Sequence, residues 1–304
     1  MILFLIEIFL LGCAIAVHFR EKIADSFLSF LAILLGLFGY FITVVILALL
    51  RISLSVQIVS ILMGVEIAVL LILKWTISRK TFFQFKKSTL WYLASGLFFI
   101  LGSMFFFRAG YVYASPDSLY LIIMSRNILQ TGLTEWYFSS PIQWGVFVPI
   151  IQIIGQFFGH EYTWFIQPII SFTFLIIFGL AIIKASRDLT TNRILPYALA
   201  FLGIGLIISS NLPWLMQFYI HTNLDTGMSF FLVVASLYFA IREKNDAWLG
   251  LTGIFIILLG LTRPENLILA ALVIVLTLGT GQISHRKLLW TFLPYLVFQI
   301  TWNL

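Results

Sequence analysis

The stretch 141-PIQWGVFVPIIQIIGQFFG-159 decides the topology of this chain, because the direction of every later segment depends on whether this stretch crosses a membrane. It is apolar, and its length permits a crossing, which takes roughly 17–25 residues. Pro141, Pro149, Gly145, Gly155 and three glutamines suit a surface or re-entrant helix better than a lipid-facing one. The stretch therefore leaves two topologies to compare.

The rest of the chain identifies the class of protein. Of its 304 residues, 61% are hydrophobic and 10% are charged, and the mean hydropathy is +1.07. Apolar runs of membrane-spanning length recur from end to end. We expect an all-α, polytopic transmembrane helix bundle of about ten spans, with a non-cytoplasmic surface-helix region at 108–162. The predicted spans are 1–19, 26–50, 53–73, 89–107, 163–183, 195–216, 226–241, 247–261, 266–280 and 288–304.

The first apolar run is expected to be a retained helix. It lacks a basic start and an obvious small-residue cleavage site, and it carries Glu7. The one cysteine, Cys13, excludes an intrachain disulfide and is interpreted as a small buried apolar residue. The net charge of +6 comes from short Arg and Lys clusters between apolar runs, which is typical of membrane topology and not of nucleic-acid binding.

The basic residues discriminate between the two topologies. If 141–159 stays on one side, fourteen basic residues share one face: Arg20, Lys22, Lys74, Arg79, Lys80, Lys86, Lys87, Lys184, Arg187, Arg193, Arg242, Lys244, Arg286 and Lys287. Four remain on the other: Arg51, Arg108, Arg126 and Arg263. If 141–159 crosses, the split becomes eight to ten. Only the first arrangement obeys the positive-inside rule, so we expect an outside N-terminus and a stretch that does not cross.

This topology predicts where the chemically capable residues lie. The loops at 108–162, 217–225 and 262–265 all open on the non-cytoplasmic side. They hold Asp117, Glu135, His160, Glu161, His221, Asp225, Arg263 and Glu265. The acids of the cytoplasmic loops lie among Lys and Arg and are interpreted as solvated loop charges. The candidate site is therefore expected on the non-cytoplasmic face.

Asp117 is the first candidate. Ser115-Pro116-Asp117-Ser118 is a good helix start, and Gly132 is a plausible helix end. An acid is also favoured near the positive end of a helix dipole. Capping and catalysis explain Asp117 about equally well from local sequence, and one residue can do both.

Three further pairs complete the candidate site. His221 and Asp225 precede an apolar run and are weak candidates for a divalent metal site, which usually needs three or more protein ligands. Arg263 and Glu265, in 262-TRPENL-267, form either a turn with an internal ion pair or a phosphate-binding guanidinium positioned by its neighbour. His160 and Glu161 directly follow the stretch 141–159.

Glu7 and Glu66 lie within predicted spans. They either mark a polar pathway or pair with residues on neighbouring helices. No Gly-rich phosphate loop, HExxH, GxSxG or CxxC motif occurs in the sequence, so ATP-driven transport and the common hydrolase mechanisms receive no support.

Four elements occur in a familiar order: Asp117 at a helix start followed by 120-YLIIMSRNILQTG-132, the Pro-led run 141–159, then 225-DTGMSFFLVVASLYFAIRE-243, and 260-GLTRPENLILAAL-272. In this order they resemble the GT-C glycosyltransferases, the superfamily of protein mannosyltransferases and lipid A aminoarabinose transferases. The resemblance covers roughly residues 89–280. It implies an N-terminal part at 1–88 and a GT-C-like transmembrane core at 89–304 with an outer loop at 108–162.

The resemblance implies an enzyme of the cytoplasmic (plasma) membrane of a bacterium. It would move a sugar from a polyprenyl-phosphate donor to a glycan, lipid or protein acceptor on the non-cytoplasmic face. Asp117 would be the general base, and Arg263, Glu265, His221, Asp225, His160 and Glu161 would bind substrate. Many members have two adjacent acids where this chain has Asp117 and Ser118, which leaves metal use open. Many also continue beyond the point where this chain stops, so we expect a truncated or minimal version.

Two other functions remain open at this stage. A transporter or flippase for a lipid-linked sugar would use Glu7 and Glu66 along its path. A non-catalytic membrane assembly subunit would use the outer residues only as caps and turns. Essential polar residues spread through the bilayer depth would favour a transporter, whereas their concentration on one face favours a transferase.

Overall fold

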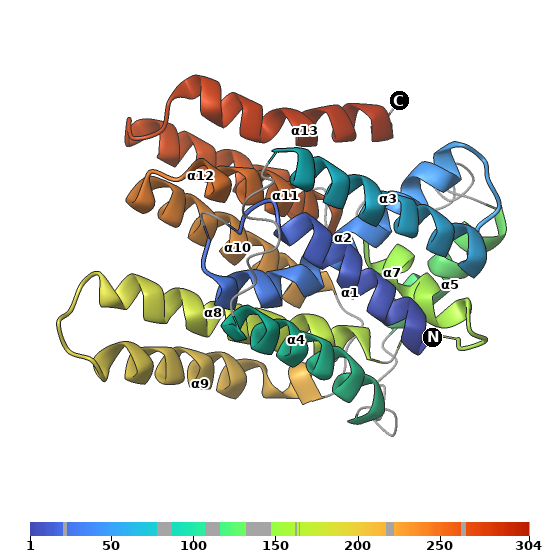
Figure 1. Cartoon of the computed structure of the whole chain (residues 1–304), viewed down its shortest axis with the longest axis horizontal. Coiled ribbons are helices and arrows are strands. Elements are labelled where there is room, and N and C mark those ends of the chain that lie inside the picture. The colour runs from blue at the N-terminus through green and yellow to red at the C-terminus, as the bar shows by residue number, and fades with distance from the viewer. Residues whose placement is uncertain are drawn as a thin grey trace. The chain divides into compact units, whose positions relative to one another are not determined.

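The computed structural model describes residues 1–20, 23–77, 87–106, 116–131, 147–161, 163, 165–216, 222–262 and 266–303. These residues form twelve helices and no strands, which confirms the all-α class (Figure 1). By their contacts the helices gather into two compact units. Unit 1 comprises Met1–Trp136 with Ile150–Ile220, and unit 2 comprises Tyr137–Pro149 with His221–Leu304. The division at residue 88, which the resemblance implies, stays a prediction.

The helices of unit 1 follow the predicted apolar runs closely. They are α1 (Ile2–Ala16), α2 (Asp25–Leu49), α3 (Val56–Ile77), α4 (Lys87–Phe106), α5 (Pro116–Thr131), α8 (Ile166–Arg187) and α9 (Leu195–Met216). The greater part of α7 (Phe147–Gln156) also belongs to this unit. Among the described residues, α2 and α3 are the two helices that are long and apolar enough to cross a membrane, judged by length and composition.

Glycines allow α1 and α2 to cross at very short range. A Cβ atom added at Gly12 would lie 1.8 Å from the carbonyl oxygen of Ala32, and one added at Gly36 would lie 2.2 Å from that of Ile8. Small residues at a helix crossing let the two backbones approach and gain van der Waals contact, as in membrane helix pairs. The α1–α2 pair is therefore the tightly packed centre of unit 1.

The third helix is attached to this pair through carboxyl groups. Ser60 of α3 donates a hydrogen bond to Glu7 of α1, and Thr43 of α2 donates one to Glu66 of α3 at 2.8 Å. Both glutamates therefore have hydroxyl partners on neighbouring helices, one of the two roles expected for them. Polar bonds of this kind hold helices together where the surroundings are apolar.

One end of unit 1 collects termini that are far apart in sequence. Arg20, after α1, lies 3.7 Å from Asp25 at the start of α2, and Thr89 of α4 donates a hydrogen bond to the same aspartate. Lys184, in the last turn of α8, has its Nζ 5.8 Å from the centroid of the Phe27 ring. The end of α8 thus lies beside the start of α2, so these two helices run in opposite directions.

Unit 2 contains α10 (Thr222–Glu243), α11 (Asp246–Thr262), α12 (Leu267–Gly279) and α13 (His285–Asn303). Thr252 of α11 donates a hydrogen bond to Ser236 of α10 at 2.8 Å, and both side chains are buried. Gly260 of α11 faces the ring of Tyr295 on α13, where an added Cβ would lie 2.3 Å from a ring carbon. Polar bonds and close glycine contacts thus connect helices in both units.

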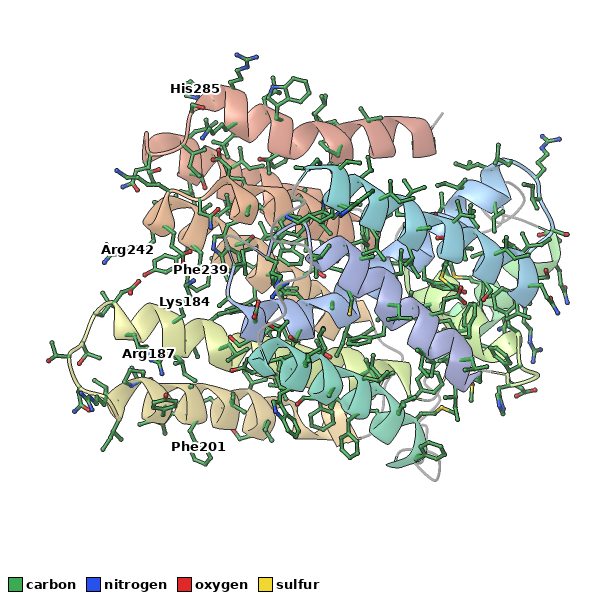
Figure 2. All side chains as sticks on the ribbon, in the orientation of Figure 1. Lys184, Arg187, Phe201, Phe239, Arg242 and His285 are labelled. Carbon is green, nitrogen blue, oxygen red and sulfur yellow. The ribbon has the colours of Figure 1, made fainter. Side chains whose placement is uncertain are left out.

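Large apolar side chains cover the outer faces of several helices. In unit 1, Phe201 of α9 and Phe98 of α4 are each 78% exposed, and Ile61 of α3 is 69% exposed; Figure 2 shows Phe201 projecting away from its helix. In unit 2, Ile268 of α12 and Trp290 of α13 are similarly exposed. Monomeric soluble proteins rarely expose apolar faces of this extent, so these faces match a lipid environment.

Candidate functional site

Helix α5 carries the first predicted site residue. The structure describes this helix from Pro116 to Thr131, and the predicted bounding residues Ser115 and Gly132 lie outside the described residues. Asp117 is therefore in the first turn, where the free backbone N–H groups and the helix dipole favour a carboxylate. The side chain of Asp117 lies outside the described residues.

Helix α7 packs against α5 through a half-buried amide. The Nε2 of Gln156 donates a hydrogen bond to the Oγ of Ser125 at 2.5 Å, and it lies 3.4 Å from the carbonyl oxygens of Ile122 and Glu161. One side chain of α7 thus contacts both the second half of α5 and the segment that follows α7. Two of the elements that the sequence placed in the outer site are joined at this point.

The chain after α7 turns back onto the helix. Gly159 has a φ of 78°, a conformation that glycine adopts readily, and the next residue donates its N–H to the carbonyl of Gly155 at 3.0 Å. Thr163 then donates its N–H to Gln152 Oε1 at 2.8 Å and its hydroxyl to the Gln152 carbonyl at 3.0 Å. This turn brings His160 and Glu161 to the surface beside the end of α7.

Glu161 forms an ion pair with α5. Its carboxylate lies 3.2 Å from the guanidinium of Arg126, and the two side chains are 79% and 49% exposed. An exposed pair of this kind contributes about 0.2–1 kcal/mol, so either partner can exchange it for a charged ligand at small cost. His160 is also exposed. Both side chains are exposed to the surface, and their substrate-binding role stays a prediction.

Two buried atoms of α7 have no hydrogen-bond partner among the described residues: Gln152 Nε2 and Gln156 Oε1. The Gln152 side chain is fully buried. A donor and an acceptor thus occur one helical turn apart in the part of α7 that faces α5 and the returning chain. A buried polar atom without a hydrogen-bond partner costs about 1–3 kcal/mol of stability. A water molecule bound between these two atoms would satisfy both of them.

The remaining predicted site residues lie at the limits of the description. Asp225 is in the first turn of α10, but its side chain lies outside the described residues. His221, Arg263, Glu265 and Glu135 lie outside them entirely. Where side chains are described, no group of three or more His, Cys, Asp or Glu residues could hold a metal ion. The side chains of His221 and Asp225, the candidate metal ligands, are not among those described.

Sequence reasoning missed the residues that hold this region together. Gln152 and Gln156 are one turn apart in an otherwise apolar helix, and Ser125 and Arg126 follow Asp117 on α5. Two amides at a spacing of four within an apolar run were the available signal, since such amides face a common partner. Which partner they meet depends on the tertiary packing.

Comparisons with protein-family models, curated proteins and solved structures gave no match.

Proposed function

We propose that this chain is a multi-pass membrane glycosyltransferase of about ten spans, with its site on the non-cytoplasmic face. The observation that carries the topology is the contact between Lys184 and Phe27. Residues in such contact occupy the same side of a bilayer. If α2, α3, α4 and α8 cross, four crossings separate these residues and return the chain to the same side. A fifth crossing by α7 would separate them.

The dimensions of α7 support the same topology. The ten described residues of α7 extend about 15 Å, half of the roughly 30 Å hydrocarbon core. Its residues Ile150, Ile151, Ile153 and Ile154 are all buried, and Tyr40 of α2 donates a hydrogen bond to the Ile150 carbonyl at 3.4 Å. Burial of this segment supports a re-entrant element, which membrane proteins tolerate where the backbone is shielded from lipid.

This topology gives α5 and the segment after α7 a common side. Asp117 would then begin a helix that faces outward and is braced by Gln156 and by the Arg126–Glu161 ion pair. In the proposed reaction Asp117 accepts the proton of the acceptor hydroxyl, whose oxygen bonds to the anomeric carbon. The bond from that carbon to the phosphate oxygen breaks, and polyprenyl phosphate leaves with the electron pair. The family resemblance assigns stabilisation of the leaving charge to Arg263, or to a cation bound by His221 and Asp225.

The hydrogen bonds of Glu7 and Glu66 favour a transferase over a transporter. Each carboxyl group accepts a hydrogen bond from a hydroxyl on another helix. This arrangement supports a role in holding α1, α2 and α3 together, which is the alternative to a polar pathway for these two residues.

The test is transfer by membranes that contain the full chain. Polyprenyl-phosphate donors carrying a hexose or a pentose are supplied with an envelope extract as acceptor, and released polyprenyl phosphate is measured. We expect Asp117→Asn to slow release by roughly 100-fold or more, because a general base contributes a factor of this order. Asp188→Asn, at an exposed acid after α8, should leave the rate unchanged. Equal rates for the wild type and Asp117→Asn would refute the proposal.

A further inference from the structure

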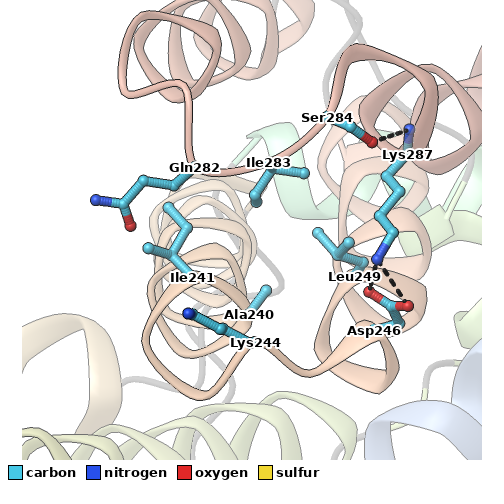
Figure 3. A pocket seen from close by; sticks show the side chains of 9 residues that line it. All are labelled: Ala240, Ile241, Lys244, Asp246, Leu249, Gln282, Ile283, Ser284 and Lys287. Carbon is cyan, nitrogen blue, oxygen red and sulfur yellow. Dashed lines mark hydrogen bonds and ion pairs between the residues drawn. The ribbon is translucent and has the colours of Figure 1, made fainter.

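Unit 2 contains a cavity that the proposed reaction does not use. Its volume is about 690 Å³, within the range of small-molecule sites. Four helix termini meet around it: the end of α10, the start of α11, the end of α12 and the start of α13. Its apolar lining is Ala240, Ile241, Leu249 and Ile283, and its polar lining is Lys244, Asp246, Gln282, Ser284 and Lys287 (Figure 3).

Two ammonium groups lie at the polar lining. Lys287 donates to both carboxylate oxygens of Asp246, at 2.7 and 2.9 Å, and keeps a third donor because an ammonium has three. Lys244 stands apart from this pair in Figure 3, and its ammonium has no hydrogen-bond or ion-pair partner among the described residues. Arg242 and Arg286, two residues before Lys244 and one before Lys287 in the sequence, are exposed basic residues of the same helix ends. The cavity therefore suits a group with negative charge and several acceptor oxygens.

The backbone at Lys244 is the second observation. Lys244 has a φ of 50°, and the following N–H, of Asn245, donates to the carbonyl of Ala240 at 3.3 Å. This is the helix ending in which glycine normally occupies the left-handed position. A lysine here costs conformational free energy that a glycine would not, and such residues concentrate at binding sites. At Lys244, unlike at Arg51, this conformation places a basic side chain at the wall of a cavity.

The surroundings of the cavity favour a lipid over a free anion. Trp290 follows Lys287 by three residues on α13, so the two lie on the same side of the helix, and Trp290 is 61% exposed. Exposed Leu289, Leu293 and Leu296 continue along α13. Tryptophan next to basic residues marks the level of lipid headgroups, and the apolar face beyond it would meet acyl chains.

We propose that this cavity binds the phosphate headgroup of an anionic membrane phospholipid, through Lys244 and the free donor of Lys287. The apolar lining receives the glycerol end of the lipid, and the acyl chains lie along α13. The proposal rests on membrane insertion of the chain and not on sugar transfer. Loss of transferase activity and loss of lipid binding are therefore separable results.

The experiment follows thermal unfolding of the full chain in a neutral detergent during titration with short-chain phosphatidylglycerol. Short-chain phosphatidylcholine and inorganic phosphate are titrated in parallel. We expect phosphatidylglycerol to raise Tm at lower concentration than phosphatidylcholine, and phosphate to have no effect. Lys244→Gly should weaken the response to phosphatidylglycerol about fivefold, the effect of one basic residue near an anionic surface. Without lipid its Tm should equal or exceed that of the wild type, since glycine suits the backbone.

Arg51→Gly is the matched control. Arg51 is also basic, has a φ of 55° and precedes a residue whose N–H donates to the Leu47 carbonyl at 2.9 Å, but it lies in unit 1. Its variant should keep the wild-type lipid response. The proposal is overturned if Lys244→Gly responds as the wild type does, if both glycine variants lose the response equally, if the two lipids act alike, or if phosphate alone reproduces the shift.

Discussion

At the scale of single residues, the crossing of α1 and α2 sets the tightest constraint in unit 1. The space that a Cβ atom would occupy at Gly12 is filled by backbone atoms of α2, including Gly36 N at 2.6 Å. Backbone atoms cannot rotate away as the end of a side chain can, so any larger residue must separate the helices. Gly102 of α4 has no atom within 4 Å of the same position. Gly12 therefore cannot accept a larger side chain without a shift of the helices, whereas Gly102 can.

We expect Gly12→Ala to destabilise the protein by about 1–3 kcal/mol, the usual effect of overpacking a close contact. Gly102→Ala should be neutral or stabilising by up to about 1 kcal/mol, because alanine favours helix over glycine. Thermal unfolding in detergent measures both. If the two variants have the same Tm, the close approach of α1 and α2 is wrong.

At the scale of elements, α7 is positioned by side chains more than by its own length. The described part of α7 is held by its burial and by the hydrogen bonds that Gln152 and Gln156 make with neighbouring segments. The same bonds orient α5, whose first turn contains Asp117. The packing of the candidate site therefore depends on the side-chain amides of α7.

We expect Gln156→Leu to loosen the contact between α5 and α7, because it removes the donor to Ser125 while keeping a similar volume. The loss should be about 1–3 kcal/mol, as for other buried hydrogen bonds, with faster amide exchange in both helices. Gln57→Leu, at an exposed glutamine of α3, should leave exchange in α5 and α7 unchanged. Hydrogen exchange read by mass spectrometry compares the two variants, and equal protection of α5 would contradict the expectation.

At the scale of the whole molecule, the chain places apolar side chains on the outside of both units and polar bonds within them. The bonds Ser236–Thr252 and Thr43–Glu66 are internal, whereas Phe98, Phe201 and Ile268 face outward. Exposing these apolar side chains to water raises the free energy of the folded chain, whereas exposing them to lipid does not. The exposed faces of these helices therefore match a lipid environment.

Single cysteines in a Cys13→Ala background test the proposed topology. We expect Ile52→Cys and Ser118→Cys to react with a membrane-impermeant maleimide in intact cells, and Leu189→Cys to react only after permeabilisation. The reason is that four crossings return residue 184 to the side of residue 27. The background protein without an added cysteine should remain unlabelled. Labelling of positions 118 and 189 from the same side would exclude the arrangement.

Much of the secondary structure could be predicted from sequence. Each of the ten apolar runs contains a helix. Boundaries differed modestly; α1, for example, ends at Ala16 and not at residue 19. The candidate site could be predicted only as a set of residues on one face. The ion pair of Glu161 with Arg126 was not foreseen, because neither residue type nor spacing selects that partner.

The sequence by itself determined the helical class, because hydropathy and turn signals act over neighbouring residues and need no distant partner. Only the tertiary structure decided that Glu7 meets Ser60, that Gln156 meets Ser125, and that the end of α8 lies beside the start of α2. It also revealed Lys244 in a glycine-like turn at the wall of a cavity. These features depend on which helix faces pack together, and that choice is made by shape and polar pairing between segments far apart in the chain.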